Sequence, residues 1–170
     1  MIGRIAAVMA ACLLSCTASA QDLTDPQIAH IAYTAGVIDI DAAKQAIAKS
    51  ETQAVVDFAE TMVRDHEAVN EQALELVKKL DVTPEDNDTS RALAQAASEK
   101  RAELDALDGS AFDKAYIDNE IAFHKQVNDA LSTLLIPSAS NTELKDLLET
   151  GLKLFQGHQQ HAEHVAAMMK

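Results

Sequence analysis

The stretch V-V-D-F-A-E-T-M-V-R-D-H-E-A-V-N-E-Q-A-L-E-L-V-K-K-L, residues 55–80, decides the fold class. Apolar residues recur along it every three or four positions with almost no interruption, which is the period of one face of an α-helix. One position of this face is ionisable, because His66 stands between Met62 and Val69. The stretch therefore predicts a long helix that places a histidine on its buried face, near its midpoint.

Further helices are predicted on both sides of this stretch. Thr24 is the expected N-cap of a helix over residues 25–49, which has a proline in its first turn. Ser50 and Gln53 fit a capping box and are expected to start the long helix, and Pro84 prevents its continuation. The other helices are predicted at residues 90–107, 111–135 and 142–168.

The connections between these helices indicate how they are arranged. The turns after residue 49 and around Pro137 are tight, whereas the passage from residue 80 to residue 111 is long and contains the helix 90–107. Two tight hairpins joined by one long crossover are the ferritin-like arrangement. No segment shows the alternation of a β-strand. The sequence thus predicts an all-α fold, an antiparallel four-helix bundle of ferritin-like type with a short extra helix in the crossover.

The other three long helices also carry ionisable residues in the middle of their apolar faces. At 100° per residue, Glu120 and His124 lie within the apolar face of the helix that contains them. Asp39 takes the inward position on the first helix, and His158 takes it on the last, with His161 at the edge of the same face. Because these positions lie near the helix midpoints, an antiparallel bundle would bring them into one layer of the core.

Two arrangements would stabilise ionisable groups in such a core layer. In the first, carboxylates and imidazoles hydrogen-bond to one another, without a metal. In the second, they bind a transition-metal ion such as Zn, Cu, Ni or Fe, all of which accept nitrogen and oxygen ligands. The candidate metal ligands are His66, Glu120, His124 and His158, with Asp39 and His161 as further candidates.

Residues 1–20 have the pattern of a secretory signal peptide, with a short basic start, an apolar run and A-S-A ending at Ala20. The apolar run is too short to span a bilayer, and no transmembrane helix is expected in the mature domain, 21–170. L-L-S-C, ending at Cys16, also resembles a bacterial lipobox. The sequence therefore predicts an exported, periplasmic product, and leaves open whether it is soluble or an outer-membrane lipoprotein anchored at Cys16.

The charge of the chain bears on its partners. The full sequence has 14 basic and 27 acidic residues, a net charge of −13, and removal of Arg4 with the leader changes this to −14. This balance argues against nucleic acid as a partner, since phosphate binding needs a basic surface. Both cysteines lie in the leader, so no disulfide is expected in the mature domain. A homodimer is left open.

Three motifs carry a resemblance to a known family. They are D-F-A-E-T-M-V-R-D-H at residues 57–66, F-D-K-A-Y-I-D-N-E-I-A-F-H at 112–124, and Q-G-H at 156–158. Together they resemble the DUF4142 family, exported bacterial proteins of ferritin-like helical fold, over about residues 27–166. The resemblance implies a periplasmic or outer-membrane-associated helical protein, and it supplies no reaction. The chain departs from the family pattern at Asp39, Asp41 and Gly157, where the family usually has glutamate.

The sequence favours a non-enzymatic, exported helical bundle whose core is a candidate site for a transition metal. The alternative is a structural or stress-related envelope protein whose polar core layer holds no metal. A metal-dependent oxidase is a weaker alternative. Glu120 and His124 are four residues apart, and no E-x-x-H motif puts both its residues on the core face, as a di-iron centre would need.

Overall fold

The computed structural model describes residues 23–169 of the chain. The predicted signal peptide, residues 1–20, and the lipidation site at Cys16 lie outside the described residues, and both stay predictions. The described part consists of helices and short connections and contains no β-strand. No helix within it is long and apolar enough to cross a membrane. The prediction of an all-α bundle is confirmed.

The described helices follow one another in an order close to the predicted one. The elements are α1 (Asp25–Lys49), α2 (Gln53–Lys79), α3 (Asp88–Asp105), α4 (Gly109–Ala130), a π-helical turn η1 (Leu131–Leu135), α5 (Ile136–Ser138) and α6 (Thr142–Met168). The predicted boundaries of α1 and α6 agree with the structure at both ends. α3 and α4 each begin two residues earlier than predicted.

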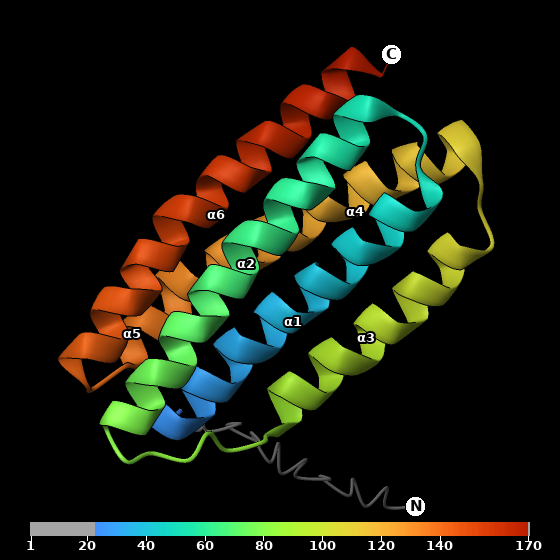
Figure 1. Cartoon of the computed structure of the whole chain (residues 1–170). Coiled ribbons are helices and arrows are strands. Elements are labelled where there is room, and N and C mark those ends of the chain that lie inside the picture. Colours follow the sequence, from blue (N-terminus) through green and yellow to red (C-terminus); the bar gives the residue numbers. More distant parts are fainter. Residues whose placement is uncertain (1–22, 170) are drawn as a thin grey trace, which may run out of the picture.

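The long helices form two antiparallel hairpins that pack together (Figure 1). α1 and α2 make the first hairpin, and α4 and α6 make the second. α2 packs along α6 and α1 along α4, so that the four long helices surround one interior. α3 lies in the crossover between the hairpins and packs on the outside of α1 (Figure 1).

The turn between α1 and α2 differs from the prediction in its capping. Ser50 is the C-cap of α1, where its backbone N–H donates to the Ala46 carbonyl at 2.8 Å, and α2 begins after Thr52. The Thr52 hydroxyl does not cap α2, because it donates to a carboxylate oxygen of Asp113 on α4 at 2.5 Å. The expected capping box of Ser50 and Gln53 was therefore wrong, since a contact with another helix determines the turn.

The chain stays helical through Pro137, which was expected to break the helix. Proline has no N–H and its ring clashes with the carbonyl four residues before it in an α-helix. Here the π-helical turn η1 directly precedes it, and the wider turn accommodates the ring. The helix therefore ends at Ser138, and the tight turn to α6 follows that residue.

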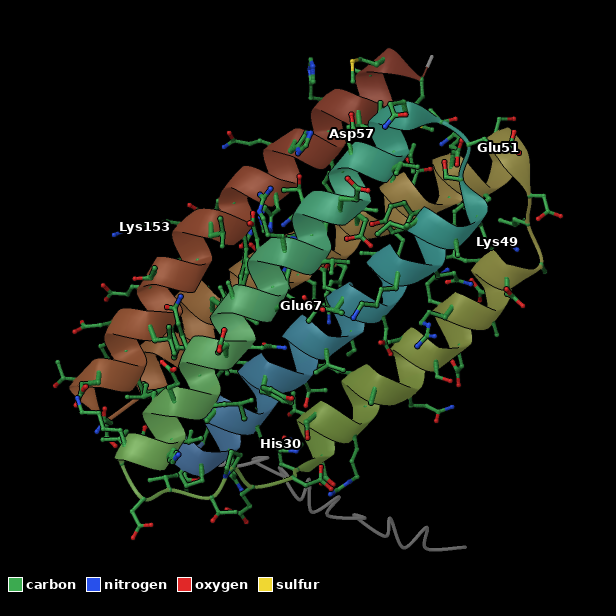
Figure 2. The ribbon with its side chains drawn as sticks, viewed as in Figure 1. His30, Lys49, Glu51, Asp57, Glu67 and Lys153 are labelled. Atoms are coloured by element: carbon green, nitrogen blue, oxygen red, sulfur yellow. The ribbon has the colours of Figure 1, made fainter. Side chains whose placement is uncertain are left out.

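Two apolar clusters fill the interior at different heights. One lies toward the α1–α2 turn and includes Phe58, Met62 and Phe112, all fully buried. The other lies toward the start of α1 and includes Ile28 and Leu131. On the outside, charged side chains such as the labelled Lys153 on α6 point away from the bundle (Figure 2). A layer of buried ionisable residues separates the two clusters.

Candidate metal centre

Ionisable side chains from all four long helices meet in this layer, which we call the polar layer. Each occupies an inward position near the middle of its helix, as the helical period requires. None of them is more than 4% exposed. The members are Asp39 on α1, His66 on α2, Glu120 and His124 on α4, and His158 on α6.

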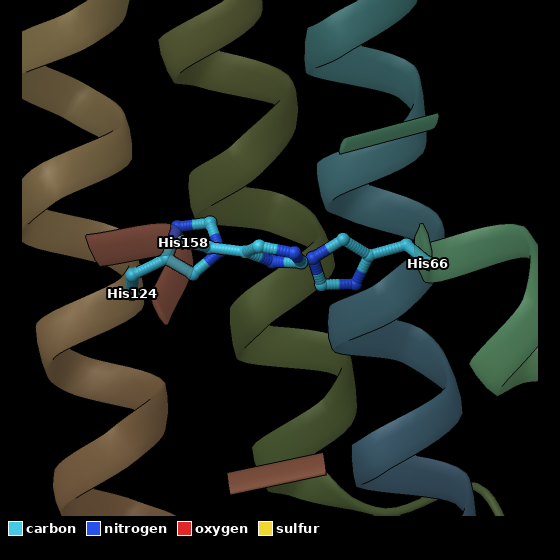
Figure 3. A group of neighbouring side chains, drawn as sticks. All are labelled: His66, His124 and His158. Carbon is cyan, nitrogen blue, oxygen red and sulfur yellow. The ribbon is translucent and has the colours of Figure 1, made fainter. Parts of the chain in front are cut away.

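The three imidazole rings of the polar layer lie side by side in the bundle interior (Figure 3). The ring centroids of His66 and His158 are 5.2 Å apart, those of His124 and His158 5.5 Å, and those of His66 and His124 5.7 Å. One nitrogen of each ring lies within 4.8 Å of the others. Nitrogens bound to one tetrahedral Zn²⁺ are about 3.3–3.4 Å apart, so the three rings would have to approach one another further to share an ion.

Hydrogen bonds fix the orientation of two of these rings. His124 donates from Nδ1 to the backbone carbonyl of Glu120 at 3.0 Å, which leaves the lone pair on Nε2. His158 donates from Nε2 to the carboxylate of Asp65 at 3.0 Å, which leaves the lone pair on Nδ1. Neither His124 Nε2 nor His158 Nδ1 has a hydrogen-bond partner among residues 23–169. A metal-binding histidine has this arrangement, with one nitrogen donating to an acceptor and the other free to ligate.

The carboxylate of Asp39 faces two of the rings. Its Oδ2 atom lies 3.4 Å from Nε2 of His66 and 3.4 Å from Nε2 of His124. These contacts are too long for well-formed hydrogen bonds. Asp39 also belongs, with Glu120 and His124, to a second group whose ligand atoms lie within 4.8 Å of one another. Asp39 is therefore placed to share an ion with the imidazoles.

Asp65 is a site residue that the sequence did not predict. Besides accepting from His158, it accepts from Nε of Arg64 at 2.8 Å. Burial alone would raise the pKa of Asp65, but the hydrogen bonds from Arg64 and His158 lower it, so that its carboxylate is charged. A charged carboxylate that accepts from one ring nitrogen raises the basicity of the other nitrogen, which binds the metal. Its position directly before His66 in the D-H motif is the only signal the sequence offers.

His161, a candidate ligand in the sequence, lies outside the polar layer. It is exposed, and its ring packs edge-on against Phe58 at a centroid distance of 5.1 Å. Three residues of helix rotate it by about 60° from His158, and that is enough to turn it away from the other rings. It plays no part in the site considered below.

The sequence matches the model of a family described as "Domain of unknown function (DUF4142)" over residues 13–165. The chain belongs to the DUF4142 family. The matched range contains every residue of the polar layer, and the resemblance noted in the sequence motifs is confirmed. Comparison of this DUF4142 chain with curated proteins and with solved structures found no match. The function therefore has to be argued from the site itself.

Burial determines the charge state of the polar layer in this DUF4142 protein. It raises the pKa of Asp39 to about 8, and burial together with the charge of Asp39 raises that of Glu120 well above its ordinary value. Burial, and secondly the neighbouring His158, lower the pKa of His124 to about 4. Burial and the other two imidazoles lower that of His66 as well. Without a bound ion the polar layer is therefore uncharged at neutral pH.

The metal-free protein is expected to lose about 2 kcal/mol of stability through Asp39 between pH 6.5 and 8. Folded Asp39 keeps its proton up to about pH 8, whereas the unfolded chain releases it near 3.8. The folded state therefore binds more protons in this window, and stability falls as pH rises. The lowered pKa values of the imidazoles make stability rise with pH, but only below their ordinary pKa of 6.5. The raised pKa of Glu120 acts in the same direction as that of Asp39.

Urea unfolding across this pH range, with a chelator present, measures the effect. Asp39→Asn should reduce the slope of stability against pH, because it removes one of the two carboxyl groups. Asp41→Asn, on the same helix but paired with Arg101 at the surface, should leave the slope unchanged. A metal-free stability that stays constant or rises from pH 6.5 to 8 would contradict the assignment of protonated carboxyl groups to the polar layer.

Proposed function

We propose that this protein binds one transition-metal ion in the polar layer. The ligands are Nε2 of His124, Nδ1 of His158, a ring nitrogen of His66 and the carboxylate of Asp39. Three imidazoles and one carboxylate form a set that suits tetrahedral Zn²⁺ and is also accepted by Cu, Ni and Fe. Glu120 lies beside this set, with its Oε2 atom 3.6 Å from Nδ1 of His124, as a neighbouring acid.

The unpartnered atoms of the polar layer are the observation that carries the proposal. Both oxygens of Asp39, both ring nitrogens of His66, and the free nitrogens of His124 and His158 are buried without a hydrogen-bond partner among the described residues. Each such group costs about 1–3 kcal/mol when it is left unpaired. The direct contacts in the layer leave this cost in place, because Asp39 Oδ2 approaches Nε2 of His66 and Nε2 of His124 only to 3.4 Å. An ion that accepts these lone pairs removes most of it, which favours metal binding over a purely structural layer.

The number of ligands bears on what the bound ion would do. Structural zinc sites have four protein ligands, whereas catalytic sites have three and keep a position open for water or substrate. Four ligands from four different helices therefore support a closed binding site. The proposed ligand set thus supports metal binding in a closed site and does not favour an oxidase.

We further propose that the protein is exported and binds the metal in the periplasm. The support is the signal-peptide pattern of residues 1–20. Processing after Ala20 gives a soluble protein, and processing at Cys16 gives a lipoprotein. Intact-mass measurement of the protein isolated from the envelope distinguishes a chain that starts at Gln21 from one that carries lipid on Cys16. An unprocessed mass would contradict export.

Metal content after reconstitution tests the proposal. The protein is stripped with a chelator, loaded separately with Zn²⁺, Cu²⁺, Ni²⁺ or Fe²⁺, and desalted before elemental analysis. We expect one ion per chain for the wild type and none for the double variant His66→Ala/His158→Ala. The matched control His30→Ala/His164→Ala removes the same number of histidines outside the polar layer, and should bind as the wild type does. A wild type that retains no stoichiometric metal would refute the proposal.

A further inference from the structure

An apolar cavity of about 130 Å³ lies between the polar layer and the start of α1. Its wall is built from α1, α2, α4, η1 and α6, and α3 contributes at one edge. Aliphatic and aromatic side chains make up most of this wall. Representative lining residues are Ile31, Ala73, Leu131, Leu135, Leu148 and Phe155.

Small side chains and the π-helical turn account for this space. Ala29, Ala32, Ala73 and Gly151 all line the cavity, so that several facing positions contribute little volume. The π-helical turn η1 contributes Leu131, Leu134 and Leu135 to the wall, and π-helical turns are frequent at functional sites. Wall atoms that face an empty space lose the contacts that a packed neighbour would give them. The cavity opens to the surface at Leu134, which lines it and is 44% exposed, so that a small molecule has a path to its apolar wall.

The cavity ends at the polar layer. Phe155 belongs to its wall and stacks on the ring of His66, with centroids 4.6 Å apart and planes at 8°. A smaller pocket of about 10 Å³, lined by Asp39, His66 and His124 among others, shares Gly36, Val127 and Phe155 with the cavity. A molecule in the cavity would thus contact the same phenyl ring that covers one ring of the proposed metal site.

The chemistry of the wall selects the ligand. No Asp, Glu, Lys or Arg is among the described residues that line the cavity, so an ion would have no counter-charge there. The net charge of −13 further disfavours anions. An engineered protein cavity of about 150 Å³ with a comparable apolar lining binds benzene. We propose that this cavity binds a small neutral apolar molecule of about the size of benzene, with or without metal in the polar layer.

Titration with benzene tests this proposal. We expect one saturable site per chain, detected by NMR shifts of cavity methyl groups or by a rise in Tm, in both metal-free and Zn²⁺-loaded protein. Ala73→Leu places three extra carbons in the cavity and should weaken benzene binding more than about tenfold. Ala48→Leu makes the same change at an exposed position of α1, and should leave binding unchanged.

Two outcomes would overturn the proposal: an absence of saturable binding to the wild type, or equal affinity in Ala73→Leu. If Ala73→Leu does not fold, Ala130→Leu fills the cavity from α4 and serves in its place. Neither variant alters a proposed metal ligand, so both should retain one Zn²⁺ per chain. In the wild type, benzene binding without stoichiometric metal, or metal binding without benzene, therefore shows which of the two proposals fails.

Discussion

Loading the metal-free protein with Zn²⁺ is expected to raise its Tm by about 8–16 °C. A ligand that binds only the folded state at a thousand times its Kd stabilises that state by about 4.1 kcal/mol. In a protein of this size each kcal/mol corresponds to about 2–4 °C in Tm. The four proposed ligands come from α1, α2, α4 and α6, so the site is not preformed in the unfolded chain and the ion binds the folded state selectively. Circular dichroism melts with Zn²⁺ and with a chelator measure it.

The matched control separates the polar layer from the acidic surface, which also attracts cations. His66→Ala/His158→Ala keeps every surface carboxylate but removes two proposed ligands, and its Tm should not respond to Zn²⁺. If the double variant gained as much stability as the wild type, the ion would be binding elsewhere. If the wild type gained none at saturating Zn²⁺, the proposed site would be wrong.

Replacement of His124 by alanine is expected to lower the affinity for Zn²⁺ by about a hundredfold to a thousandfold. Zinc binding to structural sites is worth about 10–16 kcal/mol, which is about 3–4 kcal/mol for each of four ligands, or roughly two to three powers of ten. His124 is central to the polar layer, because its Nε2 faces Asp39 at 3.4 Å and its Nδ1 is held by the Glu120 carbonyl. Competition with a chromogenic chelator measures the affinity.

Two further variants define the expected order of effects. Asp65→Asn keeps all four ligands and weakens only the acceptor that orients His158, so its expected loss is about 10–100-fold. His164→Ala removes an exposed imidazole from α6 and should change nothing. We expect the largest loss of Zn²⁺ affinity for His124→Ala, a smaller loss for Asp65→Asn and none for His164→Ala. This order would identify His124 as a direct ligand, Asp65 as the residue that orients a ligand, and His164 as a surface residue. An equal loss for His164→Ala and His124→Ala would contradict this assignment.

Local sequence signals predicted much of the fold. The start of α1 was correct because Thr24 and Gln27 form a capping box within four residues. One prediction failed because a distant group decides: Thr52 leaves its helix uncapped and donates to Asp113 on α4. The other failed because of local geometry: the π-helical turn η1 precedes Pro137, and apolar periodicity does not reveal a π-helical turn.

In the polar layer, too, the sequence predicted what local periodicity determines and missed what contacts between helices determine. Helical periodicity indicated which carboxylates and imidazoles face inward, since burial follows the apolar stripe of each helix. Periodicity could not identify Asp65, because this residue lies about 100° around α2 from His66. Asp65 belongs to the site only because His158, 93 positions further along the chain, donates a hydrogen bond to it. Periodicity also could not show that Asp39 is protonated at neutral pH, because this depends on burial by all four helices.

X-ray absorption at the zinc edge of the Zn²⁺-loaded wild type reports directly on whether the ion binds in the polar layer. The polar layer predicts four nitrogen and oxygen neighbours at about 2.0–2.1 Å, with the outer-shell scattering of three imidazole rings. His158→Ala should remove the signal of one ring. A first shell of oxygen alone, without imidazole scattering, would show that the ion does not bind at His66, His124 and His158, and would contradict the account.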